Sequence, residues 1–241
     1  MARVTAAAVV IGNEVLSAKV EEQNGAWLIK RLHEVGVTLR SLAVVPDEVD
    51  AIVEAVDRAR RVAEMVITSG GIGPTHDDVT VRAVAMALGR NVVRRPEIEA
   101  GIRAHFGAAA VPAEALRLAE VPAGTELLEN PGSRYPIFYC ERVYILPGVP
   151  ALFRKQMEVV LGRLQGEPLK MRELLLKVGE SEIARALDEV ALAMPDVAIG
   201  SYPQFDASAT YRVKITLEHE SECRVDEATE RLKQLLPAAS Y

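Results

Sequence analysis

Apolar, strand-like runs alternate with helical patterns through the first part of the chain. The strand-like runs cover residues 4–11, 37–45 and 65–69, and helical spacing of apolar residues covers 24–35, 49–62 and 80–88. This alternation indicates parallel strands joined by right-handed crossovers. Because ligands of such sheets bind beyond the carboxyl ends of the strands, we predict an α/β fold with a binding site at that edge.

A glycine-rich turn follows the third strand-like run and precedes the third helix. It reads Gly70-Gly71-Ile72-Gly73-Pro74-Thr75-His76-Asp77-Asp78-Val79-Thr80. Its glycines let the backbone approach a ligand and expose N–H groups, and the helix N-terminus adds partial positive charge. The turn therefore suits a phosphate, and the paired aspartates suit a metal ion or a proton transfer. A tight loop with helix-capping aspartates is the structural alternative.

Two further polar clusters end strand-like runs, namely Gly12-Asn13-Glu14 and Pro46-Asp47. The topology predicts that they meet the glycine-rich turn.

The second half of the chain has a less regular pattern. We predict helix over 91–121, a loop at 129–133, a strand at 143–146 and a helix from about Ala151. A linker at 164–168 divides the chain into domains 1–165 and 166–241. The second domain should hold strands at 174–178, 197–199 and 211–217, a helix capped by Ser181, and a helix at 227–236.

Composition excludes several classes of protein. Of 241 residues 49% are hydrophobic, enough for a sizeable core, and the net charge of −6 argues against bulk nucleic-acid binding. No apolar run approaches the ~20 residues of a membrane span, and the N-terminus lacks a secretory pattern. Two cysteines, Cys140 and Cys223, indicate neither a disulfide framework nor a zinc site. We expect a cytoplasmic protein without membrane or nucleic-acid partners.

The turn from Gly70 to Thr80 resembles the signature of the MoaB/MogA molybdopterin-binding fold. Its extended Pro-Thr-x-Asp-Asp form resembles the CinA-like branch and the similar domain of eukaryotic FAD synthase. Residues 134–137 and 142–144 are closer to the FAD synthase domain, and residues 178–182 resemble a small KH-like domain. Other matching segments are Ile11-Gly12-Asn13-Glu14-Val15-Leu16, Gln23-Asn24, Val44-Val45-Pro46-Asp47 and Ile145-Leu146-Pro147-Gly148-Val149-Pro150.

The resemblance implies a three-layer α/β fold with a mostly parallel sheet and a small α+β KH-like C-terminal domain. Asn13 stands where the family usually has Asp, and Ala18 stands where it usually has Gly. These departures question a carboxylate role at residue 13 and the course of the loop after the first strand.

The resemblance also implies site residues. Asp47 and Asp78 are the predicted catalytic residues, and Asp47, Asp77 and Asp78 are the predicted metal ligands. Mg²⁺ is the default ion, with Mn²⁺ or Co²⁺ as alternatives and K⁺ as an additional ion. Loop N–H groups and the Thr75 and Thr80 hydroxyls are the expected phosphate donors. The predicted ligand-binding set is Gly12, Asn13, Glu14, Asn24, Ser69, Gly70, Gly71, Gly73, Pro74, Thr75, Thr80, Pro147 and Gly148.

For the function, the resemblance implies metal-dependent pyrophosphate hydrolysis of a dinucleotide-like substrate such as ADP-ribose or FAD. The alternatives are a non-catalytic module for a pterin or nucleotide phosphate, and adenylyl transfer to molybdopterin. RNA is disfavoured because Gly179-Glu180-Ser181-Glu182 lacks the second glycine of the KH loop. Related folds oligomerise, so a homodimer or homotrimer is expected.

Overall fold

The protein divides into two compact units, Met1–Gly166 and Glu167–Tyr241. The computed structural model describes residues 3–107, 111–133, 135–164, 166–206 and 208–236. The division falls inside the linker predicted at 164–168. Arg134, part of a segment quoted for the family resemblance, lies outside the described residues. No helix in the described part of the chain is long and apolar enough to cross a membrane.

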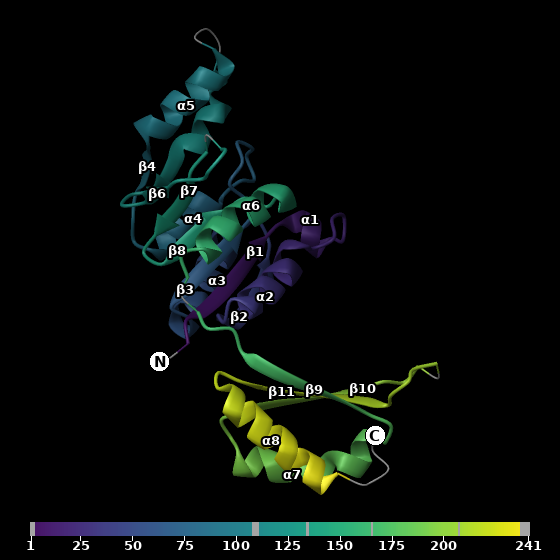
Figure 1. Cartoon of the computed structure of the whole chain (residues 1–241). Coiled ribbons are helices and arrows are strands. Elements are labelled where there is room, and N and C mark those ends of the chain that lie inside the picture. Colours follow the sequence, from purple (N-terminus) through teal and green to yellow (C-terminus); the bar gives the residue numbers. More distant parts are fainter. Residues whose placement is uncertain (1–2, 108–110, 134, 165, 207, 237–241) are drawn as a thin grey trace. The chain divides into compact units, whose positions relative to one another are not determined.

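The first unit is built on a six-stranded sheet with the order β2-β1-β3-β8-β7-β6 (Figure 1). Its parallel strands are β1 (Thr5–Ile11), β2 (Thr38–Val45), β3 (Met65–Ser69) and β8 (Val143–Leu146). Two antiparallel strands, β7 (Ile137–Cys140) and β6 (Glu126–Leu128), extend the sheet beyond β8. The predicted mostly parallel α/β fold is confirmed.

Helices cover both faces of this sheet. Ala6 and Ala8 of β1 face α2 (Asn24–Glu34) and α6 (Pro150–Leu161), whereas Ala7 and Val9 face α3 (Val49–Val62) and α4 (Thr80–Ala87). Successive residues of a strand point to opposite faces, so a strand buried on both sides is apolar throughout. That requirement explains the continuous apolar run of β1.

The segment predicted as helix over 91–121 is mixed. It contains β4 (Val92–Arg94), α5 (Pro96–Phe106), the 3₁₀ helix η1 (Glu114–Ala119) and β5 (Glu120–Pro122), and β4 pairs antiparallel with β5. The helix prediction is wrong for the two short strands. Pro96 starts α5 because a proline at the first helical position lacks only an N–H that would have no partner. A short helix, α1 (Asn13–Leu16), also follows β1 where only a polar loop was predicted.

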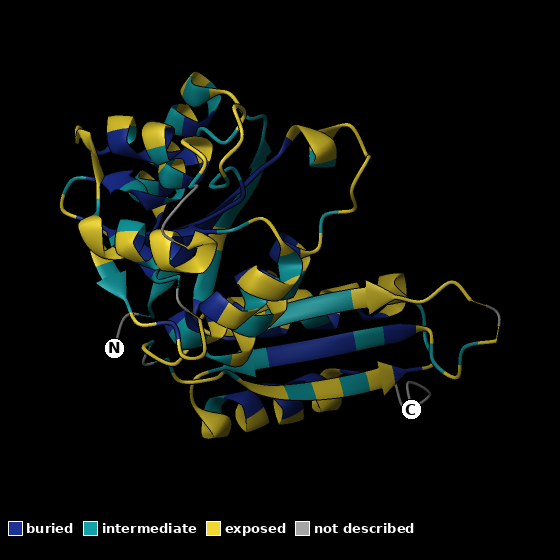
Figure 2. Ribbon diagram, turned by 90° about the horizontal axis from the view of Figure 1, so that it is seen from above, coloured by how far each residue is buried: buried dark blue, intermediate teal, exposed yellow. Residues whose placement is uncertain are grey.

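The second unit is a three-stranded antiparallel sheet with two helices on one face (Figure 1). The strands are β9 (Lys170–Leu176), β10 (Ala198–Pro203) and β11 (Val213–His219), and the helices are α7 (Glu180–Ala193) and α8 (Glu222–Leu235). Figure 2 shows that the central strand β11 is the most buried of the three. The predicted small α+β domain is confirmed.

The start of α7 differs from the predicted Ser181 cap. Gly179 occupies the cap position, and its N–H donates to the Glu182 carboxylate at 2.8 Å. Ser181 lies inside the first turn. The sequence Gly-Glu-Ser-Glu offers two possible caps, Gly179 and Ser181. The hydrogen bond between Glu182 and the Gly179 N–H favours Gly179.

Candidate functional site

A pocket of about 760 Å³ opens at the carboxyl ends of the parallel strands. Glu14 follows β1, the glycine-rich turn follows β3, and residues 147–150 follow β8. The other walls come from α6 and from two loops. The lining residues are Glu14, Val20, Gly70, Gly71, Ile72, Gly73, Asp78, Leu118, Asn130, Gly132, Ser133, Tyr135, Pro147, Gly148, Val149, Pro150, Leu152, Lys155 and Gln156.

The first two glycines of the turn are required by the backbone. Gly70 has φ +109°, and a Cβ there would lie 2.1 Å from the Ile11 carbonyl oxygen. Gly71 has φ +65°, and its Cβ would lie 2.3 Å from Thr80 Oγ1. A side chain at either position would therefore be strained and would collide with a buried neighbour. These residues bring the chain from β3 directly into the pocket wall.

Three consecutive residues of the turn line the pocket and have N–H groups without a protein acceptor. Gly70 donates its N–H to the Leu146 carbonyl at 3.1 Å. Within the described part of the chain, the N–H groups of Gly71, Ile72 and Gly73 donate to no protein acceptor. Consecutive free N–H groups of this kind form an anion-binding concavity. Phosphate binding by this loop stays a prediction.

The two threonines of the turn have a different role from the predicted one. The buried Thr80 hydroxyl donates to the Gly70 carbonyl at 2.8 Å, and its N–H donates to the Gly71 carbonyl at 3.0 Å. The Thr75 hydroxyl donates to Asp78 Oδ2 at 2.5 Å. Both hydroxyl protons are thus used within the turn, and the prediction that they donate to a phosphate is corrected. They fix the shape of the loop.

The predicted carboxylates separate into two groups. Asp78 and Glu14 line the pocket, whereas Asp47 and Asp77 do not. Asp47 is half-buried and accepts the Asn13 N–H at 2.7 Å, so it fixes the start of α1. Asp77 is exposed, and its carboxylate lies 3.9 Å from the exposed His76 ring.

The predicted metal triad is not assembled in this geometry. No three His, Cys, Asp or Glu side chains among the residues described here gather closely enough to hold a metal ion. Asp78 is the one member of the predicted triad in the pocket wall. Its Oδ2 accepts the Thr75 N–H at 2.8 Å, and its Oδ1 accepts no hydrogen bond from any described residue.

Asn24 connects three segments of the chain next to the pocket through hydrogen bonds. It is 5% exposed, and its Nδ2 donates to Ser69 Oγ at 2.9 Å and to the Gly148 carbonyl at 2.7 Å. These bonds connect the start of α2, the end of β3 and the turn after β8. Asn24 does not cap its helix, since the cap position belongs to Gln23. It supports the wall but is not part of the lining.

Of the other predicted ligand residues, Pro147 and Gly148 line the pocket, whereas Gly12, Asn13, Ser69 and Pro74 do not. Gly12 donates its N–H to the Val45 carbonyl at 3.1 Å, which positions the loop that carries Glu14. Ala18 has φ +55°, which lies in the left-handed region that favours glycine, the residue that the family resemblance leads one to expect there.

Several lining residues were not predicted from the sequence. Tyr135 donates its hydroxyl to the Leu118 carbonyl at 2.8 Å, and burial together with the charge of Asp78 raises its pKa. Lys155 of α6 donates to the Gly132 carbonyl at 3.0 Å. Tyr135 lies in the segment 134–137 that resembles the FAD synthase domain, but that resemblance gave it no role, and Lys155 has no such signal; both reach the pocket from segments far along the chain from the glycine-rich turn.

Comparisons with known proteins agree with this architecture. Residues 7–166 match the family described as probable molybdopterin binding domain, and residues 168–241 match the middle domain of FAD synthase. A crystal structure of the protein CinA, of unknown function, from Thermoplasma acidophilum is 32% identical. It superposes with a TM-score of 0.61 and covers 66% of this chain and 98% of that one.

Two relatives extend the comparison. A protein of Archaeoglobus fulgidus is 35% identical over 80% of this chain and 83% of its own length. A probable FAD synthase of Caenorhabditis elegans is 32% identical over 97% of this chain, which spans 50% of that protein. The chain therefore belongs to the molybdopterin-binding-domain family, with a C-terminal unit of the type found in the middle of FAD synthase.

Proposed function

We propose that the first unit binds a nucleotide-like phosphate ester and hydrolyses its pyrophosphate bond with the help of a divalent metal ion. The observation that carries this proposal is the composition of the lining of one pocket. Free N–H groups of residues 71–73 stand there together with the carboxylates of Glu14 and Asp78. A volume of about 760 Å³ also lies within the range of small-molecule sites.

The donor set fits a hard cation. Mg²⁺ binds through one or two carboxylates, and substrate phosphates and waters complete its octahedron. Glu14 and Asp78 would supply those carboxylates, in place of the predicted set of Asp47, Asp77 and Asp78. A bound metal ion would supply Lewis acidity and an activated water. The chain's own part is to orient the phosphates through loop N–H groups and to stabilise charge on their oxygens.

The family comparison supports a nucleotide-related ligand. One relative is a probable FAD synthase, and the second unit matches the FAD synthase middle domain. FAD and ADP-ribose both contain a pyrophosphate between two nucleoside-like halves. Hydrolysis adds one water across the P–O–P bridge and yields two monophosphates, AMP with FMN or AMP with ribose 5-phosphate.

The test incubates the whole chain with FAD or ADP-ribose and Mg²⁺, Mn²⁺ or Co²⁺, with and without K⁺. Product is separated by chromatography. We expect mononucleotide release that stops with a chelator and falls about 10²–10³-fold in Asp78→Asn, the cost typical of losing one charge-stabilising group. Asp77→Asn is the matched control, because it removes the neighbouring exposed carboxylate and should leave turnover near the wild-type value.

Binding without turnover on any substrate would contradict the enzyme and favour the second candidate, a non-catalytic pterin or nucleotide module. The observation behind that candidate is the absence of a three-carboxylate cluster among the described side chains. Adenylyl transfer to molybdopterin requires a second substrate and is tested by adding ATP.

The homodimer or homotrimer and the cytoplasmic location remain predictions. Light scattering on the whole chain tests the oligomeric state.

A further inference from the structure

A second, smaller pocket of about 190 Å³ adjoins the main one. The two share Ile72, Gly73, Asp78 and Tyr135 in their linings. Asp78 therefore stands at the boundary between them. The rest of the smaller pocket is formed by α4 and the segment 92–120, through Val81, Arg82, Val92, Arg117 and Glu120.

Two guanidinium groups, Arg82 and Arg117, line this smaller pocket together with the carboxylates of Asp78 and Glu120. Arg82 makes no hydrogen bond or ion pair with any residue that the structure describes. Arg117 donates to the Thr75 carbonyl at 3.3 Å and has no carboxylate partner in the same part of the chain. Glu120 is engaged with Arg94 at 3.3 Å. Among the other described arginines of this unit, Arg31 and Arg90 are paired with glutamates, whereas Arg40 and Arg58 have no ion pair and line neither pocket.

Arg82 is exposed to solvent and lies close to the N-terminus of its helix. It is the third residue of α4, whose N-terminal turn already carries partial positive charge. A cation in the first turn of a helix destabilises the helix unless an anion lies close to it. An unpaired arginine there, beside a second unpaired arginine, leaves the smaller pocket suited to an anion.

We propose that the smaller pocket receives a second phosphoryl group, so that Arg82 and Arg117 select ligands with a pyrophosphate bridge over simple monophosphates. The inference rests on the proposed binding of a first phosphate by the glycine-rich turn. A volume of about 190 Å³ is below the roughly 300 Å³ of the smallest typical small-molecule sites, so it fits a phosphoryl group and not a whole nucleoside. The pyrophosphate would then pass beside Asp78.

The test measures binding and needs no turnover. Methylenediphosphonate carries two phosphonyl groups joined by a P–C–P bridge that cannot be hydrolysed, and orthophosphate carries one phosphoryl group. Calorimetry with the whole chain and Mg²⁺ gives both dissociation constants. We expect Arg82→Ala and Arg117→Ala each to weaken methylenediphosphonate binding about tenfold, as for a lost charge-assisted hydrogen bond. Orthophosphate binding should change less than about twofold.

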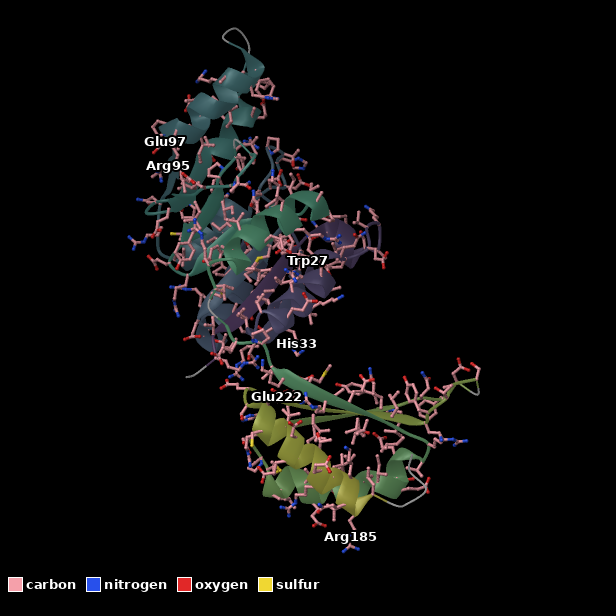
Figure 3. The ribbon with its side chains drawn as sticks, viewed as in Figure 1. Trp27, His33, Arg95, Glu97, Arg185 and Glu222 are labelled. Atoms are coloured by element: carbon pink, nitrogen blue, oxygen red, sulfur yellow. The ribbon has the colours of Figure 1, made fainter. Side chains whose placement is uncertain are left out.

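Two controls separate specific recognition from general charge. Arg185→Ala removes an exposed arginine of α7 in the other unit (Figure 3) and should leave both constants unchanged. Arg82→Lys and Arg117→Lys keep the charge and should recover part of the affinity. Raising the salt concentration should weaken methylenediphosphonate binding by the wild-type chain more than binding by the alanine variants.

Wild-type affinity in both alanine variants, equal losses for both probes, or no binding of methylenediphosphonate to the wild-type chain would each overturn the inference. Failure of the hydrolytic proposal gives a different result. A chain that binds the probe through these arginines but releases no mononucleotide from FAD or ADP-ribose keeps this inference and loses the hydrolysis. Mononucleotide release by the wild-type chain, together with wild-type methylenediphosphonate affinity in the arginine variants, would keep the hydrolysis and overturn this inference.

Discussion

Gly70 is the residue at which the chain leaves β3 and enters the pocket wall. Its backbone has φ +109°, and the Ile11 carbonyl occupies the place where a side chain would begin. Two independent costs therefore act on any substitution, namely strain in the backbone and a collision with backbone atoms that cannot move aside. The same close approach brings β1 and the glycine-rich turn together, so that Glu14 and the loop N–H groups share one pocket.

Replacing Gly70 by alanine separates these costs when it is compared with Gly89. Gly89 has φ +63° and open space around its missing Cβ. Gly89→Ala should lower the free energy of unfolding by about 1 kcal/mol, from backbone strain alone. Gly70→Ala should lower it by about 3 kcal/mol, because overpacking adds to the strain. Urea unfolding measures both, and equal losses would contradict the steric account.

Residue types in the turn could be predicted from the sequence, but the partners of their atoms could not. The glycines were predicted because their requirement is local: Gly70 and Gly71 both adopt a positive φ. The hydroxyl of Thr80 is different, because its acceptor is the carbonyl of a residue ten positions earlier. Asp47 likewise follows a strand as predicted, but its carboxylate Oδ2 accepts a hydrogen bond from the Asn13 N–H. Only the folded chain shows which polar atoms remain available to a ligand.

At the scale of elements, long periodic segments and the fully apolar short strand β8 could be predicted, whereas the three-residue strands could not. The apolar run of β1 and the stripe of α2 carry enough residues to reveal their period. Strands β4, β5 and β6 have three residues each, too few for any period to be read. Their existence depends on pairing with distant partners, for example Val93 with Val121. The antiparallel edge of the sheet was missed for the same reason.

The second unit contains an ion-pair cluster that joins its elements. Asp196, in the loop between α7 and β10, accepts hydrogen bonds from Arg224 of α8 at 2.9 and 2.7 Å. His219 of β11 lies 3.4 Å from the same carboxylate. Hydrogen bonding from Arg224 lowers the pKa of Asp196 from 3.8 to about 2. The cluster is solvent-exposed, so its effect is screened by salt.

This shift predicts a pH dependence of stability in the second unit. A carboxyl whose pKa is lower in the folded state stabilises the fold above its unfolded pKa of about 3.9, and the contribution is lost as the pH falls through the folded value. The contribution of Asp196 should therefore disappear between pH 4 and pH 2. Other carboxylates, such as Glu222, also titrate in this range, so the comparison needs a variant.

Asp196→Asn is that variant. Urea unfolding of the wild-type and Asp196→Asn chains at pH 5, 4, 3 and 2 gives a stability difference at each pH, and low salt makes the effect largest. At pH 5 we expect the wild-type chain to have the higher free energy of unfolding. This difference should decrease steadily below pH 4. A difference that stays constant across the series would contradict the role of this carboxylate.

At the scale of the whole molecule, each unit has its own hydrophobic core. The two clusters of the first unit bury the opposite faces of the six-stranded sheet, and the third cluster, with Leu176, Ile215 and Val225 at its centre, belongs to the second unit. Domains that bury their apolar surface internally can fold alone. The glycine-rich turn and every residue of the two pockets lie in the first unit.

A chain of residues 1–166 should therefore keep the binding site. Gly166 belongs to it, because its backbone packs so closely on the Val35 carbonyl that a Cβ would lie 2.1 Å from that oxygen. We expect cooperative thermal unfolding and a methylenediphosphonate affinity within about twofold of the whole chain, a difference below roughly 0.4 kcal/mol. Cooperative unfolding combined with lost affinity would show that the second unit completes the site, and the two-pocket description would then have to include it.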